Sequence, residues 1–497
     1  MKENSQRIVN EEAVSFQVRE VGKVKSIHKF IVIAEGMPSC VNGQMVEFSN
    51  GKKGLVIGFV EDEIQILILG SSAGIRVGDE VYNRGKFLSL PVGESFIGRI
   101  VNSLCEPEDE LGPIEAREFY PVFRVAPGVM ERVPVERPLE TGILTIDATI
   151  PIGRGQRQLL IGDRLTGKTT VAVDTIINQR GKDIVCIYCC IGKPYSSLLK
   201  VLDVFKEKKV MDYTIIVSGI ASASPGEQYL APYTAATLGE YFMYNGKDAL
   251  VIFDDLTRHA WVYRQISLLL RRAPGREAYP GDIFYLHSQL MERAGQLKPE
   301  KGGGSMTFLP IVEVQQGDVT GYISTNVISM TDGQIYFSTP LFNKGFRPAI
   351  DLGLSVSRIG ARVQWPATKA FSRDLRLGYL RYRELLQMTQ LRAATLSKEA
   401  IASLKRGQAI TEILIQPKNK PLPMEEGVVF LYAISIGVLD ELSVSQIKKF
   451  KEKFISRLRE WYPDFLSKLR ERKVLTDDCI EILYMALDRY FKEESKE

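Results

Sequence analysis

The stretch GDRLTGKT, residues 162–169, constrains the fold of this chain more than any other. Gly162, Gly167, Lys168 and Thr169 follow the spacing G-x-x-x-x-G-K-[ST]. The run RQLLI before it reads as a strand, and TTVAVDTIINQ after it reads as a helix. Such glycines let backbone N–H groups converge on phosphate oxygens, at the positive end of the helix. The pattern predicts an α/β domain that binds nucleotide phosphates, in preference to an incidental glycine turn.

A carboxylate is expected at the end of another strand, where it would hold Mg²⁺ together with the hydroxyl of Thr169. The run ALVIFDD, residues 249–255, supplies Asp254 and Asp255. Asp254 is the preferred metal-side residue, and Asp255 is placed to cap the helix that starts at LTRHAWVYRQ. The alternative, in which Asp254 only caps this helix, stays open from the sequence.

The rest of the chain divides into regions that differ in the spacing of their apolar residues. Residues 22–90 hold short alternating runs and a hairpin signal at Asn50-Gly51, which predict a small β-barrel. Residues 91–372 alternate strand runs with helical stretches and predict a parallel sheet with crossover helices. The runs are KFIVIAEG, GQMVEFSN, KGLVIGFV and IQILILG for the barrel, and RQLLIG, DIVCIYCCIG, YTIIVSG and DALVIFDD for the sheet.

Residues 373–497 are helical in pattern. Apolar side chains recur there at steps of three and four, at Leu375, Tyr379, Tyr382 and Leu386, and again at Phe450, Phe454, Leu458 and Trp461. Residues 1–21 form an N-terminal extension, in which SQRIVNEEAVSFQV suggests a short amphipathic helix. The expected architecture is therefore a β-barrel, a P-loop α/β domain and a helical domain.

Composition limits the kinds of partner that the chain is expected to bind. Lys and Arg total 64 against 60 Asp and Glu, so the net charge of +4 calls for neither nucleic acid nor an anionic membrane. The longest apolar run, residues 427–439, is too short to span a bilayer and reads as a buried helix. Three of the six cysteines cluster in VCIYCCIG, where a buried strand is preferred over a metal site.

Three long segments carry a resemblance to the alpha subunits of F-type ATP synthases. They are PIGRGQRQLLIGDRLTGKTT, YRQISLLLRRAPGREAYPGDIFYLHSQLMERA and TNVISMTDGQIYFSTPLFNKGFRPAIDLGLSVSRIG. Within the last, residues 348–357 fit the family signature P-[SAP]-[LIV]-[DNH]-x-x-x-S-x-S. The resemblance covers essentially the whole chain and implies the same three domains in the same order.

The resemblance also implies partners and a cofactor. Alpha subunits alternate with beta subunits in a ring of three plus three around a rotating gamma stalk. The ring also joins a delta or peripheral stalk and a membrane sector that moves protons or sodium ions. Alpha subunits bind ATP or ADP with Mg²⁺ without turning it over, and the beta subunits catalyse. Because the first residues have neither an apolar signal core nor the composition of a transit peptide, we expect a peripheral location on the cytoplasmic face of a bacterial plasma membrane, with a plastid thylakoid as the alternative.

The resemblance assigns residues to the nucleotide site. The phosphates are expected to meet the loop residues Gly162, Asp163, Arg164, Leu165, Thr166, Gly167, Lys168, Thr169 and Thr170. The adenine pocket is expected to use Phe342, Arg347, Pro348 and Gln416. Mg²⁺ is assigned to Thr169 and Asp254.

Arg358, directly after LSVS, is implied to be an arginine finger that reaches a neighbouring beta subunit's site. Such an arginine raises the rate by about 10³–10⁵. Ser355 is implied to be needed for activity, and Ser355 and Ser357 are expected to order this turn. A structural ion pair is the alternative role for Arg358.

Catalytic relatives carry a carboxylate where this chain has Lys193, in the segment IGKPYSS. A lysine ammonium does not act as a general base at neutral pH unless it is strongly desolvated. The sequence therefore indicates a chain that holds nucleotide without hydrolysing it, with a solvated surface lysine as the alternative reading.

The chain departs from the alpha-subunit pattern at three places, where the family usually has glutamine. These are Leu165 in the phosphate loop, Lys193, and Lys418 in the loop ILIQPKNKPLP. We expect these departures to weaken the binding of the nucleotide.

Two other functional classes fit the sequence less well. An autonomous hexameric motor, such as a helicase or secretion ATPase, would need its own catalytic carboxylate, and a helicase would also need a nucleic-acid-binding barrel. The barrel here is mixed in charge, with EDE at 61–63. A scaffold that has lost nucleotide binding conflicts with the retained Lys168, Thr169 and Asp254.

Overall fold

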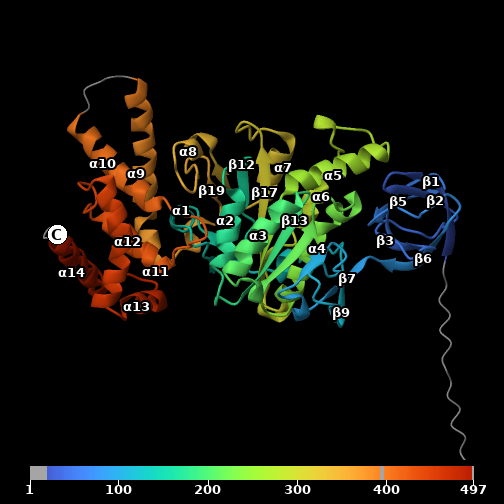
Figure 1. The fold of residues 1–497 in the computed structure, drawn as a ribbon, viewed down its shortest axis with the longest axis horizontal. Coiled ribbons are helices and arrows are strands. Elements are labelled where there is room, and N and C mark those ends of the chain that lie inside the picture. The colour runs from blue at the N-terminus through green and yellow to red at the C-terminus, as the bar shows by residue number, and fades with distance from the viewer. Residues whose placement is uncertain (1–19, 392–396, 495–497) are drawn as a thin grey trace, which may run out of the picture. The chain divides into compact units, whose positions relative to one another are not determined.

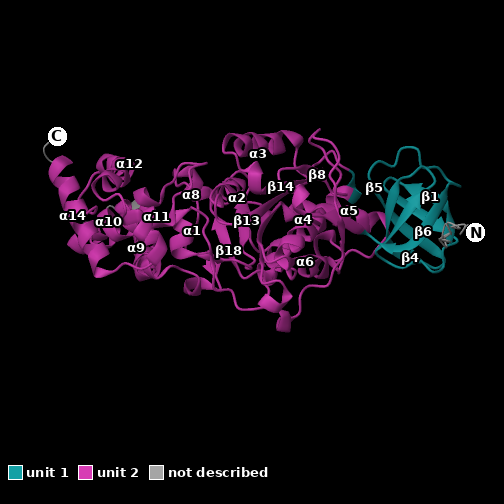
Figure 2. Ribbon diagram, turned by 90° about the horizontal axis from the view of Figure 1, so that it is seen from below, with its two compact units in different colours: residues 1–88, 224–226 teal, residues 89–223, 227–497 magenta. Residues whose placement is uncertain are grey.

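The computed structural model describes residues 20–391 and 397–494 (Figure 1). The suggested helix in residues 5–18 lies outside them. The described residues form two compact units, 20–88 with 224–226 and the remaining ones (Figure 2). The predicted fold class is confirmed, with a β-barrel, a mostly parallel α/β sheet and a helical part.

The first unit is a closed barrel whose strands follow the order β1-β2-β5-β4-β3-β6. Every neighbouring pair is antiparallel, and β1 with β6 closes the barrel. Val24, Val32 and Val46 point inward and are buried, because alternate residues of a strand face the same side. The Asn50-Gly51 turn joins β3 to β4 as predicted. The strands are β1 (Glu20–His28), β2 (Ile31–Glu35), β3 (Gln44–Phe48), β4 (Lys53–Val60), β5 (Glu63–Leu69) and β6 (Glu80–Phe87).

The second unit contains a sheet in which the described residues form nine strands. Its order is β19-β18-β12-β17-β15-β13-β14-β8, with β16 paired to β17. Strands β8, β14, β13, β15, β17, β12 and β18 run parallel, while β16 and β19 are antiparallel additions. The strands are β8 (Ile100–Asn102), β12 (Leu159–Asp163), β13 (Ile184–Ile191), β14 (Thr214–Gly219), β15 (Asp248–Asp254), β16 (Gly295–Gln296), β17 (Ser305–Val314), β18 (Gly333–Phe337) and β19 (Val356–Ser357).

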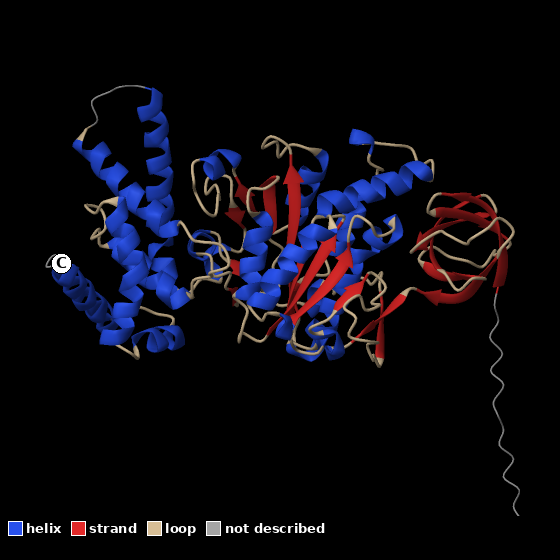
Figure 3. Ribbon diagram, viewed as in Figure 1, coloured by secondary structure: helices blue, strands red, loops and turns tan. Residues whose placement is uncertain are grey.

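Helices cover both faces of this sheet, whose strands are the red arrows between the blue helices of the central part in Figure 3. On one face, Tyr188 of β13 meets the ring of Phe205 from α3 edge-on, at 5.9 Å between centroids. On the other face, a Cβ added to Gly239 of α4 would lie 3.0 Å from Val251 and 3.4 Å from Ile187. Because both faces are covered, β13 is buried along its whole length, and its three cysteines are free and buried as predicted.

The helices around the sheet are α1 (Leu144–Thr149), α2 (Lys168–Ile177), α3 (Tyr195–Glu207), α4 (Pro225–Tyr244), α5 (Leu256–Leu269), α6 (Ile283–Met291), α7 (Tyr322–Met330) and α8 (Thr339–Asn343). Two short antiparallel pairs complete this part, β7 (Ser89–Val92) with β9 (Glu118–Pro121) and β10 (Pro138–Leu139) with β11 (Ile152–Gly153).

The C-terminal part is helical, as the spacing of its apolar residues predicted. It belongs to the same compact unit as the sheet, since one hydrophobic core joins residues of α1, such as Leu144, to residues of α11, such as Val428. The run at 427–439 lies largely in α11 and is mostly buried, and no helix among the described residues is long and apolar enough to cross a membrane. The helices are α9 (Pro366–Leu391), α10 (Lys398–Leu414), α11 (Met424–Ser435), α12 (Val444–Trp461), α13 (Phe465–Arg472) and α14 (Asp477–Glu494).

Candidate functional site

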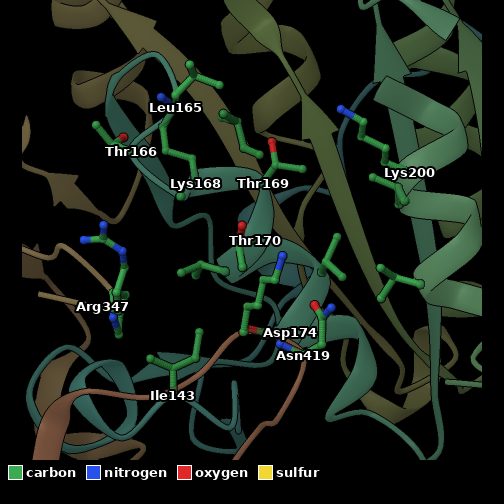
Figure 4. A pocket seen from close by; sticks show the side chains of 18 of the residues that line it. Ile143, Leu165, Thr166, Lys168, Thr169, Thr170, Asp174, Lys200, Arg347 and Asn419 are labelled. Atoms are coloured by element: carbon green, nitrogen blue, oxygen red, sulfur yellow. Dashed lines mark hydrogen bonds between the residues drawn. The ribbon is translucent and has the colours of Figure 1, made fainter. Parts of the chain in front are cut away.

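A cavity of about 720 Å³ opens at the carboxyl ends of the parallel strands, where α/β sheets bind their ligands. The loop after β12 and the start of α2 form one wall, and the loop 416–421 forms another. Figure 4 shows Lys168, Thr169 and Thr170 following one another into α2, with Arg347 and Lys200 on opposite sides. The volume lies within the range of small-molecule and cofactor sites.

The two glycines of the loop are required for different reasons. A Cβ on Gly162 would lie 2.4 Å from the carbonyl oxygen of Phe337 in the neighbouring strand β18, so only glycine fits there. Gly167 has φ of 101°, in the left-handed region, and is the residue directly before α2. Together they allow the tight turn that brings the N-terminus of α2 to the cavity.

Lys168 is buried beneath the loop. Its Nζ donates hydrogen bonds to the carbonyl oxygens of Gly162 at 2.8 Å and Asp163 at 2.5 Å. Burial lowers the pKa of Lys168 to about 8, although nearby carboxylates, Glu313 foremost, oppose the shift. The ammonium therefore remains largely protonated at pH 7 and available to an anion in the cavity.

Asp254 ends β15, and its side chain contacts Thr169. Its Oδ2 accepts hydrogen bonds from the hydroxyls of Thr169 at 2.8 Å and Tyr188 at 2.7 Å. Asp255 caps α5, because its carboxylate accepts the backbone N–H of Arg258 at 2.9 Å. The two neighbouring aspartates thus have separate roles, and the alternative in which Asp254 is only a helix cap is not supported.

Lys193, two residues after the end of β13, is not a solvated surface lysine. Its side chain is only 13% exposed, its Nζ forms an ion pair with Oδ1 of Asp254, and it donates to the hydroxyl of Thr169 at 3.1 Å. Burial alone would lower the pKa of Lys193, but the carboxylates of Asp254 and Asp255 outweigh it, and the pKa lies above its ordinary value. A cation therefore occupies the position at which the sequence resemblance leads us to expect a carboxylate in a catalytic chain.

The same contacts decide how well Mg²⁺ fits. A hydroxyl and a carboxylate are suitable oxygen donors for Mg²⁺, which demands near-octahedral geometry. Here the ammonium of Lys193 contacts both predicted ligands, Thr169 and Asp254, and Asp254 is fully buried and does not line the cavity. The residues as arranged do not fit an ion that is held by both of them.

The far side of the cavity contains the residues expected around adenine. Arg347 stacks over the ring of Phe342 at 3.6 Å and donates to its carbonyl oxygen at 2.5 Å. Pro348 and Gln416 also line the cavity. The amide of Gln416, however, accepts from the backbone N–H of Leu144 at 2.7 Å and donates to the carbonyl oxygen of Gly142 at 3.1 Å. Gln416 therefore ties the 416–421 loop to the start of α1.

Most of the predicted phosphate-loop residues line the cavity, and two do not. Those that do are Arg164, Leu165, Thr166, Gly167, Lys168, Thr169 and Thr170. Gly162 and Asp163 are the last two residues of β12, and the Asp163 carboxylate accepts hydrogen bonds from the backbone N–H of Gly317 at 2.7 Å and from the hydroxyl of Thr339 at 2.5 Å. Asp163 thus anchors the loop.

Sequence reasoning missed several residues that line the cavity. They are Asp174, Tyr188, Lys200, Arg258, Glu313, Asn419 and Lys420. The carboxylate of Asp174, in the second turn of α2, accepts the backbone N–H of Asn419 at 2.8 Å and so fixes the opposite wall. An acidic residue inside the apolar face of the predicted helix was a usable signal for Asp174, whereas Asn419 depended on long-range folding.

Ser355 and Arg358 lie outside the cavity lining. The hydroxyl of Ser355 is fully buried, donates to the carbonyl oxygen of Asp351 at 2.6 Å and accepts from the backbone N–H of Tyr336 at 2.9 Å. Arg358 follows β19, and its backbone N–H donates to Asp332. Its side chain is exposed, and its guanidinium forms neither a hydrogen bond nor an ion pair with any residue that the structure describes. The alternative of a structural ion pair at Arg358 therefore finds no support here.

Comparison with known families gives three matches in chain order. Residues 17–85 match the beta-barrel domain of the ATP synthase alpha/beta family. Residues 142–357 match its nucleotide-binding domain, and residues 364–490 match the C-terminal domain of its alpha/beta chain. The matched nucleotide-binding region contains the phosphate loop, Lys193 and Asp254.

Proposed function

Because this chain belongs to the ATP synthase alpha/beta family, we propose that it is the non-catalytic, alpha-type subunit of a rotary F-type ATP synthase. The subunit holds ATP or ADP in its own cavity without hydrolysing it. Its Arg358 reaches into the site of a neighbouring beta-type subunit, which catalyses the reaction.

The observation that carries this proposal is the ion pair of Lys193 with Asp254. Hydrolysis needs a group that orients and polarises the attacking water. An ammonium group in an ion pair has no lone pair to accept a proton. The position expected for the catalytic base therefore holds a group that cannot act as a base. A catalytic, beta-type chain would be expected to place a carboxylate there.

The cavity offers contacts for both the phosphates and the base of a nucleotide. The N-terminus of α2 and the ammonium of Lys168 lie in one wall of the cavity, where they would contact the phosphates of the nucleotide. Arg347 and Phe342 form a stacked pair that suits an aromatic base. Mg²⁺ at Thr169 and Asp254 stays a prediction, and the contacts of Lys193 argue against it.

The role of Arg358 is supported by its exposure and by its unpaired guanidinium among the described residues. A planar, always charged fork suits a phosphoryl group that gains charge in the transition state. Ser355 holds the turn before it, with its hydroxyl bonded to the backbone of Asp351 and Tyr336. We therefore treat Ser355 as a positioning residue and Arg358 as the catalytic one.

The remaining assignments rest on the resemblance to alpha subunits. We propose three copies alternating with three beta subunits around a gamma stalk, attached through a delta or peripheral stalk to a membrane sector that moves protons or sodium ions. The complex would lie on the cytoplasmic face of a bacterial plasma membrane. Membership of a multisubunit ATP synthase follows from the family itself.

The test is to co-express the chain with its cognate beta and gamma subunits and to measure ATP hydrolysis. We expect Arg358→Ala and Arg358→Lys each to lower turnover by about 10³ or more, because lysine does not reproduce the fork. Arg362→Ala is the matched control, since Arg362 is an exposed arginine of the following turn, and it should leave turnover nearly unchanged.

The isolated chain is assayed alongside and should bind nucleotide without hydrolysing it. Turnover by the isolated chain, together with an unchanged rate in the complex of Arg358→Ala, would contradict the proposal. Glu313, a carboxylate that lines the cavity, would then become the candidate base.

A further inference from the structure

Lys193 contacts both residues that the sequence assigned to magnesium. Its ammonium donates to the hydroxyl of Thr169 at 3.1 Å and forms an ion pair with the nearer oxygen of Asp254. An ammonium group offers three donors and no acceptor, so each contact uses a lone pair that a metal ion would need. The position of the expected divalent cation is thus next to a cation that belongs to the chain.

The carboxylate of Asp254 has little capacity left for a metal. One oxygen accepts from Thr169 at 2.8 Å and from Tyr188 at 2.7 Å, and the other is paired with Lys193. Asp254 is fully buried and does not line the cavity, whereas Thr169 and Lys193 do. An ion that entered from the cavity would meet the ammonium before it reached Asp254.

The charge of the cavity lining points the same way. Two acidic residues line it, Asp174 and Glu313. Eight basic residues line it: Arg164, Lys168, Lys193, Lys200, Arg258, Arg347, Lys418 and Lys420. A lining with this excess of positive charge matches the full negative charge of a free nucleoside triphosphate better than the reduced charge of its magnesium complex.

From these contacts we propose that the ammonium of Lys193 replaces Mg²⁺ in this subunit, so that the cavity binds free ATP or ADP in preference to the magnesium complex. The inference rests on the proposed function and adds to it the ionic form of the ligand. The chain then holds its nucleotide without the metal that phosphoryl transfer needs.

The test compares ATP affinity of the isolated full-length chain in EDTA and in excess Mg²⁺. For wild type, ATP should bind at least as tightly in EDTA as in Mg²⁺. Lys193→Gln frees the oxygens of Thr169 and Asp254, so Mg²⁺ should strengthen its binding by roughly tenfold or more relative to wild type. Lys200→Gln is the matched control, because it removes one positive charge from the same cavity, and Lys200 contacts neither Thr169 nor Asp254 through a hydrogen bond or ion pair. It should weaken binding in both solutions, and Mg²⁺ should strengthen its binding much less than that of Lys193→Gln.

A second measurement uses only wild type and so does not depend on the folding of a variant. Chain loaded with ATP is treated with excess EDTA, and bound ATP is counted after removal of free ligand. Retention is expected, and release of ATP by EDTA would overturn the inference. So would a Lys193→Gln variant that melts like wild type yet shows no greater benefit from Mg²⁺. Failure to bind ATP in either solution would instead reject nucleotide holding, and with it the proposed function.

Discussion

Arg293 and Glu240 form an ion pair in the interior of the sheet domain, with 2.7 Å between Nε and Oε1 and 2.8 Å between Nη2 and Oε2. Their side chains are 1% and 0% exposed. The guanidinium also donates to the carbonyl oxygen of Val122 at 2.9 Å and to the hydroxyl of Thr237 at 3.0 Å. One buried cation thus joins α4 to the segment that follows β9.

Glu240→Gln is expected to lower the free energy of unfolding by about 3–5 kcal/mol, because it leaves the buried guanidinium without a counter-charge. Glu441→Gln is the matched control, since the Lys405–Glu441 pair is exposed and should be worth about 1 kcal/mol or less. Urea titration of both variants measures the difference. Equal losses would contradict the special cost of the buried pair.

The hydrogen bond from the backbone N–H of Asn419 to Asp174 should matter for ligand binding. Asp174→Ala removes the acceptor and frees the 416–421 wall, so we expect ATP affinity to fall by roughly tenfold, the cost of one hydrogen bond to a charged group. Asp174→Asn keeps an oxygen in the same place and should retain most of the affinity. A fluorescent ATP analogue reports both values, and equal weakening by the two variants would show that charge, not the hydrogen bond, is what counts.

The phosphate loop could be predicted because its information is local. Gly162, Gly167 and Lys168 act through backbone geometry within a few residues of one another, so spacing alone identified them. The segments that form β12, β13, β14 and β15 were recognised for a similar reason. Because these strands are buried on both faces, their sequences are continuous stretches of apolar residues.

Two strands were harder to recognise from sequence. Strand β17 lies between β12 and β15 although Pro310, which has no N–H to donate, interrupts its pattern. Strand β6, which closes the barrel, is mostly exposed along its second half and shows no clean alternation. Their places in the fold are decided by partners far along the chain.

The direction in which a side chain points also could not be predicted from the sequence. The sequence placed Lys193 after a strand but not its ammonium against Asp254, 61 residues later. It placed Gln416 near the base but not its amide on the backbone of Gly142 and Leu144. Both outcomes follow from packing between separate elements, which periodicity does not encode.

Gly162→Ala is expected to abolish nucleotide binding. The new Cβ would lie 2.4 Å from the carbonyl oxygen of Phe337, and a backbone atom in a parallel sheet does not move aside easily. Gly181→Ala is the control, because Gly181 also has positive φ but no atom lies within 4 Å of an added Cβ, so it should bind ATP normally. Equilibrium binding of ATP measures both. Wild-type affinity in Gly162→Ala would mean that the loop has room that the structure does not show.

The buried pair of His259 and His287 predicts how stability changes with pH. The carbonyl oxygen of Tyr229 accepts from Nε2 of His259 at 3.0 Å, so neutral His259 carries its proton there, and its Nδ1 accepts from Nε2 of His287 at 3.1 Å. The remaining Nδ1 of His287 has no partner among the described residues. Burial lowers the pKa of His259 to about 4, and burial followed by the neighbouring ring lowers that of His287.

Below pH 6.5 the two histidines therefore bind protons in the unfolded chain but remain neutral in the folded chain. The free energy of unfolding falls as the pH decreases toward 4. His259 alone should cost about 2 kcal/mol at pH 5 relative to pH 7.5. Burial raises the pKa of Asp147 and Asp174 to about 6, which acts in the opposite direction, so the informative quantity is the difference from a variant. Urea titrations at pH 5, 6 and 7.5 should show that His259→Gln with His287→Gln loses less stability on acidification than wild type, and parallel pH profiles would mean that the two rings titrate normally in the folded chain.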